Sequence, residues 1–208
     1  VMVDFFKVST RDIKLGKGIG VEVYPNFIVG KSKDLMIRGG DFYALWVEER
    51  KLWSMDEDDV ICLVDRELDL YAKKLREKTE STVVVSHMWD AKTGMIDRWH
   101  KYCQHQLRDN YHMLDEKLIF SNDLAIKEDY ASKRLNYPLE AGDISAWDKL
   151  IGTLYLPEER HKIEWVIGAI VSGESKTLQK FMVLYGSAGT GKSPILNVIQ
   201  LLFDGYYP

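Results

Sequence analysis

Hydrophobic and polar positions alternate over short distances early in the chain and over helical distances later. Residues 1 to about 53 carry short apolar runs broken by turn residues, a pattern that predicts strands joined by turns. Within them, residues 42–53 predict a hairpin around a charged turn, with Tyr43 and Trp46 packing against Trp53. Packing across the hairpin is the more common role for such rings, and stacking on nucleic-acid bases is the alternative.

Two longer stretches place apolar side chains at helical spacing. The first follows Ser54, begins with an acidic turn at 56–59 and ends in a basic turn near Arg76, so charge suits the helix dipole at both ends. A short apolar run at 83–85 precedes the second, a helix of about fifteen residues. The side chains that we expect on the buried faces are Val60, Val64, Leu68, Tyr71 and Leu75 in the first helix and Met95, Trp99, Tyr102 and Leu107 in the second.

Neither helix predicts a metal site. Four carboxylates in a first helical turn, as at 56–59, are typical of dipole compensation, and metal binding is the less favoured interpretation. His100 and Cys103 are three residues apart and share a helix face. His105 does not share that face, and no further pair completes the four ligands that a zinc site needs.

The second half of the chain predicts two more strands and then helices. Residues 118–121 and 124–127 have the pattern of short strands around an Asn-Asp turn. Ser145 and Asp148 form a capping-box pattern at the start of one helix, and Pro157 opens another that ends at Gly173. The expected buried stripe of that last helix consists of Ile163, Val166, Ile167 and Ile170.

These elements predict an α/β chain with two domains. A boundary near Gly142 separates an α+β accessory domain, residues 1–142, from a second domain at 143–208. The chain also begins with Val and stops soon after its last predicted helix, which suggests a piece of a longer polypeptide.

Composition narrows the classes of function. The hydrophobic fraction of 46% predicts a real core, and the net charge of −4 excludes a global basic field, so any DNA contact has to come from a local patch. Basic residues outnumber acidic ones in one early region, for which a solvated charged surface is the more common explanation. That region holds Lys7, Arg11, Lys14, Lys17, Lys31, Lys33 and Arg38 against Asp4, Asp12, Glu22 and Asp34.

Cysteines and apolar run lengths bear on the compartment. Cys62 and Cys103 lie far apart, which predicts neither a disulfide framework nor a metal knuckle and fits a reducing compartment. No apolar run approaches the ~20 residues of a membrane span, and the first residues lack the features of a signal peptide. We therefore expect a soluble, cytoplasmic protein with no membrane partner.

The strongest chemical signal is a glycine-rich loop between an apolar strand and a helix. The strand is expected at 181–185, the helix at 195–203, and the loop between them fits the pattern G-x-x-x-x-G-K-[ST]. Such a match arises by chance in on the order of one in a hundred chains of this length, so a chance glycine-rich turn is the alternative. The predicted nucleotide-binding residues are Gly186, Ser187, Ala188, Gly189, Thr190, Gly191, Lys192 and Ser193.

The chemistry of this loop explains its spacing. Gly189 and Gly191 let successive backbone N–H groups curl around a polyphosphate at a helix N-terminus, where the dipole also favours negative charge. Lys192 is the candidate catalytic residue, a point charge on the outer phosphates, and the Ser193 hydroxyl is the candidate Mg²⁺ ligand. Pro194 follows at a position where a backbone N–H would reach the α-phosphate, and proline has no such donor.

With these residues assembled, the chain resembles the replicative primase-helicases of bacteriophages and poxviruses, whose motor belongs to helicase superfamily 3. Residues 42–53 and the acidic helix start after them look like the opening of the domain that precedes the motor in this family, and residues 120–123 and 134–139 look like its end. Residues 157–193 are similar to the lead-in helix and Walker A segment. Only the Walker A part is specific by itself. Thr190 departs from the family, which commonly has Asn there.

The resemblance implies the first strand-loop-helix unit of a P-loop NTPase after the accessory domain. It implies ATP and Mg²⁺ as ligands, a homo-oligomeric and usually hexameric ring, and single-stranded DNA or a replication fork as partner. The parent protein would be a helicase that hydrolyses ATP, with a primase or primase-polymerase domain before this piece. The family's metal-binding carboxylates, polar sensor and arginine finger come after residue 208, so we expect the chain alone not to hydrolyse ATP at a useful rate. The alternative function is a non-enzymatic DNA-binding or docking module.

Overall fold

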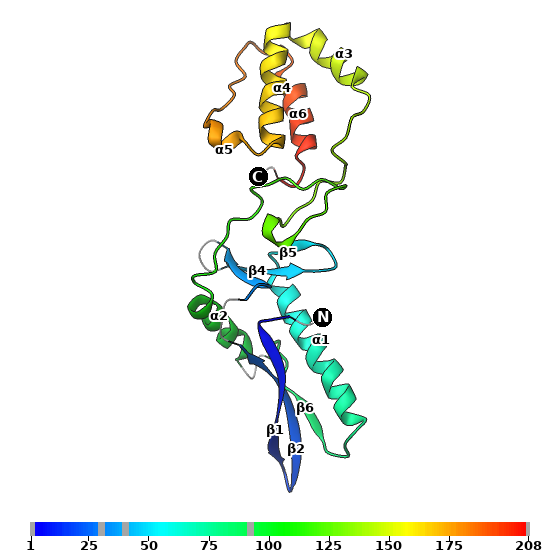
Figure 1. Ribbon diagram of the computed structural model, residues 1–208, viewed down its shortest axis with the longest axis vertical. Helices are drawn as coiled ribbons and strands as arrows, with labels where there is room; N and C mark the ends of the chain where they lie inside the picture. Colours follow the sequence, from blue (N-terminus) through cyan, green and yellow to red (C-terminus); the bar gives the residue numbers. More distant parts are fainter. Residues whose placement is uncertain (1–2, 29–31, 39–41, 91–93, 207–208) are drawn as a thin grey trace. The chain divides into compact units, whose positions relative to one another are not determined.

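The chain forms two compact units, Val1–Leu114 and Asp115–Pro208 (Figure 1). The computed structural model describes residues 3–28, 32–38, 42–90 and 94–206. The division lies well before the boundary near Gly142 that the sequence predicts. Side chains explain this placement, because Tyr206 donates a hydrogen bond of 2.9 Å to the carbonyl oxygen of Lys133 and Tyr137 donates one to that of Leu202. These bonds tie the segment before Gly142 to the C-terminal helix of the second unit.

One sheet of the first unit has the strand order β1-β2-β6. Strands β1 (Phe6–Leu15) and β2 (Gly18–Phe27) form an antiparallel hairpin, and β6 (Val83–Val85) pairs in parallel with β2. Gly16 adopts a φ of 60° at the hairpin turn, a conformation that costs glycine little. The apolar run at 83–85 thus forms the third strand of this sheet.

The second sheet has the order β3-β4-β5 and contains the predicted aromatic hairpin. Its strands are β3 (Leu35–Arg38), β4 (Phe42–Val47) and β5 (Leu52–Ser54). Trp46 lies opposite Trp53 with their ring centroids 5.8 Å apart, as expected. Tyr43 does not join them: its ring meets Trp99 edge-on at 5.6 Å. Successive strand residues point to opposite faces, so Tyr43 and Trp46, three positions apart, cannot share one.

Two helices complete the first unit. Helix α1 (Glu57–Arg76) begins at the N-cap Asp56, whose side chain accepts a hydrogen bond from the backbone N–H of Asp58, and its acidic and basic ends follow the prediction. Its buried face includes Val60, Val64 and Leu68, but Ala72 takes the place expected for Tyr71, which is exposed. Helix α2 (Met95–Gln106) buries Met95, Trp99 and Cys103.

The two strands expected at 118–121 and 124–127 are absent from the described residues of the second unit, which have only a 3₁₀ turn, η1 (Lys127–Asp129), in this region. The backbone finds other partners: Leu135 N–H donates to Ile119 O at 2.8 Å and Ser121 N–H to Tyr137 O at 3.0 Å. The Asp123 carboxylate accepts from Phe120 N–H at 2.7 Å. A local side-chain bond of this kind competes with strand pairing.

Four helices follow: α3 (Ser145–Leu154), α4 (Pro157–Val171), α5 (Ser175–Leu178) and α6 (Lys192–Leu202). The capping box predicted at Ser145 is wrong, because Ser145 is already helical and its N–H donates to the Asp143 carboxylate at 2.9 Å. Pro157 opens α4 as expected. The helices bury one apolar cluster of Ile151, Ile163, Ile195, Ile199 and Phe203.

The fold contains both helices and sheets, as the sequence predicts at the level of class. The strand expected at 181–185 is not formed, so the strand-loop-helix unit expected at the glycine-rich loop is incomplete. Within the ranges that the structure describes, no helix combines the length and the apolar character needed to cross a membrane.

Candidate functional site

The glycine-rich loop, residues 186–191, leads directly into α6. One face of that helix packs in the apolar cluster, where Ile195 and Ile199 are buried together with Ile151 and Ile163. The position of the first turn of α6, and with it the end of the loop, is therefore set by packing rather than by the loop itself.

The segment before the loop, residues 181–185, forms neither a helix nor a strand. The side chains of Phe181, Val183 and Tyr185 are 88%, 68% and 98% exposed, while Met182 and Leu184 are half-buried. The alternation is that of a strand, as the sequence predicts. No other described segment pairs with it, however, and strand structure requires a hydrogen-bonded neighbour. The expected strand is wrong for that reason.

Gly191 is the loop position where only glycine fits. Its φ is 81°, in the left-handed region, and a Cβ atom there would lie 2.7 Å from Cδ2 of Leu154. Leu154 ends α3, so the close approach joins the loop to the helix before it. Gly189 has a φ of 80° with open space around it, so its requirement is for backbone conformation alone.

The loop curls around the ammonium group of Lys192. This group donates hydrogen bonds to the carbonyl oxygens of Gly186 at 2.8 Å and Ser187 at 2.6 Å, and to the hydroxyl of Thr190 at 3.1 Å. The Thr190 hydroxyl in turn donates to Ser187 O at 3.0 Å. Four of the predicted site residues are thus brought together around one cation. Ala188 and Gly189 form the exposed outer turn of the loop.

The N-terminus of α6 opens onto the same loop. Its N-cap, Gly191, offers no side-chain hydrogen bond to the helix, and the N–H groups of the first turn have no carbonyl partner within the helix. Lys192 and Ser193 carry such N–H groups, and Pro194 carries none. The Ser193 side chain is exposed on this turn. Together with the helix dipole, these groups make a local site for an anion.

A pocket of about 410 Å³ borders the loop and brings in residues that the motif does not contain. Lys162 and Glu159 on α4 line it together with Thr190 and Lys192. The hydroxyl of Tyr155 is buried here without a hydrogen-bond partner among the described residues. Sequence patterns alone did not single out these three side chains. The spacing of Glu159 and Lys162, three residues apart on one face of the helix before the loop, is the sequence signal that could have identified these two.

The described residues contain no group of three or more His, Cys, Asp or Glu side chains arranged to hold a metal ion. The one predicted metal ligand, Ser193, has a free approach from solvent. Mg²⁺ is commonly held by few protein groups together with substrate phosphates and waters, and a single hydroxyl beside a phosphate site fits that mode.

Comparisons of the chain with protein-family models, with curated proteins and with solved structures return no match. The candidate site accordingly rests on its own residues. A glycine-rich loop, a lysine ammonium group and a helix N-terminus converge within a few residues, and this combination attracts phosphate groups.

Proposed function

We propose that residues 186–193 bind the phosphates of ATP and that the chain is part of an ATP-dependent replicative DNA helicase of the phage or poxvirus primase-helicase type. The observation that carries the proposal is the placement of the Lys192 ammonium group inside the glycine-rich loop at the start of α6. Loop, lysine and helix dipole act on the same small volume.

In the proposed site, Lys192 moves from two backbone carbonyl oxygens to the outer phosphates. Hydrogen bonds between ionised partners are roughly twice as strong as neutral ones, so the exchange favours the nucleotide. The N–H groups at the start of α6 hold the inner phosphates, and Ser193 contributes its hydroxyl to Mg²⁺, which the phosphates bind on the other side. The bound metal would screen phosphate charge during transfer.

The helicase part of the proposal includes a homo-oligomeric ring, single-stranded DNA or a fork as partner, and the cytoplasm as location, which is the host's if the protein is viral. These follow from the family resemblance of residues 42–53 and 157–193 together with the site. A small-molecule kinase fits less well, because a complete α+β unit precedes the loop.

Titration calorimetry with ATP and Mg²⁺ tests the nucleotide site. We expect Lys192→Ala to weaken binding by at least about tenfold, since a hydrogen bond to a charged group contributes roughly 1.5–3 kcal/mol. Lys149→Ala is the matched control, because it removes the same charge from an exposed position on α3 in the same unit. Equal affinity for the two variants, or loss of binding in both, contradicts the proposal.

The parent protein tests the helicase. There, Lys192→Ala should abolish nucleotide-driven unwinding and leave the thermal midpoint unchanged, because the side chain lies in an exposed loop outside the apolar core. A variant that still unwinds DNA, or one that is inactive only because it unfolds, would refute this part of the proposal.

A further inference from the structure

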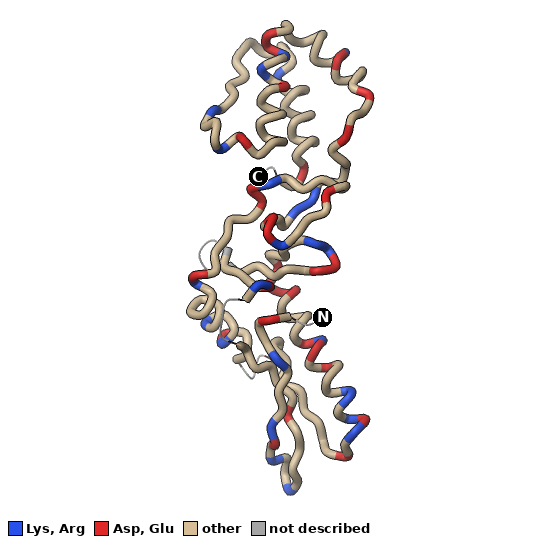
Figure 2. Tube along the Cα trace, in the orientation of Figure 1, with Lys and Arg blue, Asp and Glu red and all other residues tan. Residues whose placement is uncertain are grey.

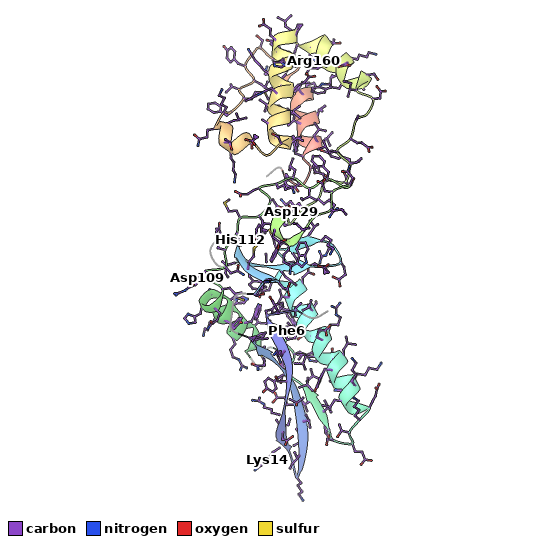
Figure 3. All side chains as sticks on the ribbon, in the orientation of Figure 1. Phe6, Lys14, Asp109, His112, Asp129 and Arg160 are labelled. Carbon is purple, nitrogen blue, oxygen red and sulfur yellow. The ribbon has the colours of Figure 1, made fainter. Side chains whose placement is uncertain are left out.

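One face of the β1–β2 hairpin carries a group of polar and basic side chains. In the antiparallel register, Lys7 lies opposite Asn26, Ser9 opposite Tyr24 and Arg11 opposite Glu22. Alternate strand residues share a face, so these pairs lie together on one side of the sheet. The opposite side contributes Phe6 and Val23 to the core, whereas Lys7, Arg11 and Asn26 on this face are exposed and Glu22 is 13% exposed. Figure 2 shows basic residues along the hairpin, whose far end is marked by Lys14 in Figure 3.

Arg11 is held in a defined position on this face. Its guanidinium carbon lies 5.1 Å from the centroid of the Tyr24 ring, and its Nε donates to the carboxylate of Glu22. Glu22 also accepts a hydrogen bond from the hydroxyl of Ser86. The bond from Arg11 lowers the pKa of Glu22, so the ion pair persists at neutral pH. The Arg11 side chain nevertheless remains 63% exposed.

Beside Arg11 is a pocket of about 470 Å³. The apolar residues Pro25, Phe27 and Met95 line it, and its polar lining residues besides Arg11 are Glu22, Tyr24, Asn26, Ser86 and Arg98. A volume of this size suits one nucleotide, and the mixture of apolar surface with a few polar groups is typical of ligand sites. Arg11 lies on β1, Asn26 on β2 and Arg98 on α2, so three elements of the same unit contribute to the pocket.

We propose that this pocket binds a base of single-stranded DNA, which stacks on the Arg11 guanidinium while the neighbouring phosphates lie against Arg98 and Lys7. Bases stack on aromatic rings and on guanidinium planes without regard to sequence, and Tyr24 orients that plane from behind. On this face of the hairpin, Lys7 and Arg11 carry two positive charges against the one negative charge of Glu22, which favours the phosphate backbone despite the negative net charge of the chain.

The choice of DNA as the ligand rests on the proposed helicase function. The residues of this site all lie in the first unit, whereas the nucleotide loop lies in the second unit. Of the basic residues in the early part of the sequence, Lys7 and Arg11 belong to the proposed DNA site. Lys31 lies outside the described residues.

Fluorescence anisotropy of a labelled oligothymidylate with the 208-residue chain tests the site. We expect Arg11→Ala to weaken binding about tenfold, which is the effect of losing one stacked base. Arg50→Ala is the matched control: Arg50 also pairs with a carboxylate, that of Asp59 at 2.6 Å, and is 57% exposed. This control should bind as the unaltered chain does. Lys7→Ala should reduce the slope of log affinity against log salt by about 0.7, the value for one phosphate contact.

Arg11→Lys separates stacking from charge, because lysine keeps the positive charge and loses the planar face. We expect it to bind nearly as weakly as Arg11→Ala. Full affinity in Arg11→Lys, equal losses in Arg11→Ala and Arg50→Ala, or no binding of the oligonucleotide by the unaltered chain would overturn the proposal.

Lys192→Ala distinguishes failure of this site from failure of the nucleotide site. It should leave oligonucleotide affinity unchanged while ATP binding weakens by at least about tenfold. If ATP does not bind but the Arg11 effect is present, the DNA site stands without the nucleotide site. An oligoribonucleotide of the same length that binds more tightly than the oligothymidylate would overturn the assignment to DNA.

Discussion

The ammonium group of Lys192 lies 2.8 Å from the carbonyl oxygen of Gly186, across the glycine-rich loop. The cation that a phosphate would need is thus already bonded to the start of the loop. Binding of a nucleotide has to exchange these backbone bonds for bonds to phosphate. The affinity of the site therefore depends on how many other donors the loop and α6 supply.

Pro194 limits that number, because it lies in the first turn of α6 and has no N–H. We predict that Pro194→Ala and Pro194→Thr both tighten nucleotide binding by roughly tenfold or more in a chain that extends through the whole motor domain, since a hydrogen bond to a charged group contributes about 1.5–3 kcal/mol. Alanine restores the N–H without adding a hydroxyl. Calorimetry that finds unchanged or weaker binding for both would show that this amide does not face the phosphate or that proline holds the loop in place.

Gly191→Ala should destabilise the second unit by about 1–3 kcal/mol, because alanine is strained at a φ of 81° and its Cβ would meet Leu154 at 2.7 Å. The contrasting variant is Gly168→Ala in the last turn of α4, where an added Cβ meets nothing within 4 Å. There we expect a gain of roughly 0.5–1 kcal/mol, the usual difference between the two residues in a helix. Thermal unfolding of both variants measures the opposite signs, and a neutral Gly191→Ala would refute the close packing of the loop on α3.

Glu164 predicts a pH dependence within α3 and α4. Its carboxylate accepts a hydrogen bond of 2.8 Å from Trp147 Nε1 and one of 2.8 Å from Arg160, the residue marked in Figure 3, and these bonds lower its pKa below the ordinary 4.5. A lowered pKa in the folded state stabilises the fold above pH 4.5, and the contribution is lost as pH falls through the folded-state value. Glu164→Gln should therefore reduce the protection of α4 amides against hydrogen exchange at pH 7 and have little effect on it near pH 3.

Amide hydrogen exchange in α4 measures this difference. Glu174→Gln provides a control, because Glu174 is exposed and forms no ion pair with the described residues. If the effect of Glu164→Gln is the same at both pH values, the ion pair with Arg160 does not contribute to stability in solution.

The hydroxyl of Tyr206 connects two distant segments of the second unit. It donates to Lys133 O at 2.9 Å and accepts from Ile119 N–H at 3.5 Å. Tyr206→Phe should cost about 1 kcal/mol of unfolding free energy, the usual net value of such a hydrogen bond, and should increase proteolysis between residues 118 and 137. Tyr185→Phe alters the same group at a side chain that is 98% exposed and should change neither quantity. Identical digestion of all three proteins would contradict the tie between the segments.

Local sequence patterns account for the helices because their determinants are local. The spacing of Val60, Val64 and Leu68 already specifies the buried face of α1, and Pro157 specifies the start of α4. The hairpin with Trp46 opposite Trp53 also depends on a short turn. The segment at 181–185 has an equally clear pattern, but a strand needs a partner from elsewhere in the chain, which no local pattern supplies.

The candidate site likewise has one part that the sequence predicts and one part that it does not. The loop and Lys192 could be predicted, because the motif encodes both the glycine conformations and the position of the cation. The roles of Lys162 and Tyr155 in lining the pocket could not, because they depend on how α3 and α4 pack beside the loop. Likewise, the link between residues 118–137 and α6 arises from tyrosine hydroxyl groups whose partners are 65 or more residues away.

The exposed segment 181–185 should affect how the chain behaves in concentrated solution. Its five side chains are uncharged, no strand among the described residues pairs with it, and the side chains of Phe181, Val183 and Tyr185 are 88%, 68% and 98% exposed. Short uncharged segments of this type form intermolecular cross-β contacts. Concentrated samples of the chain should therefore lose monomer by aggregation that begins at this segment, so a lysine in place of Val183 would lengthen their useful storage time.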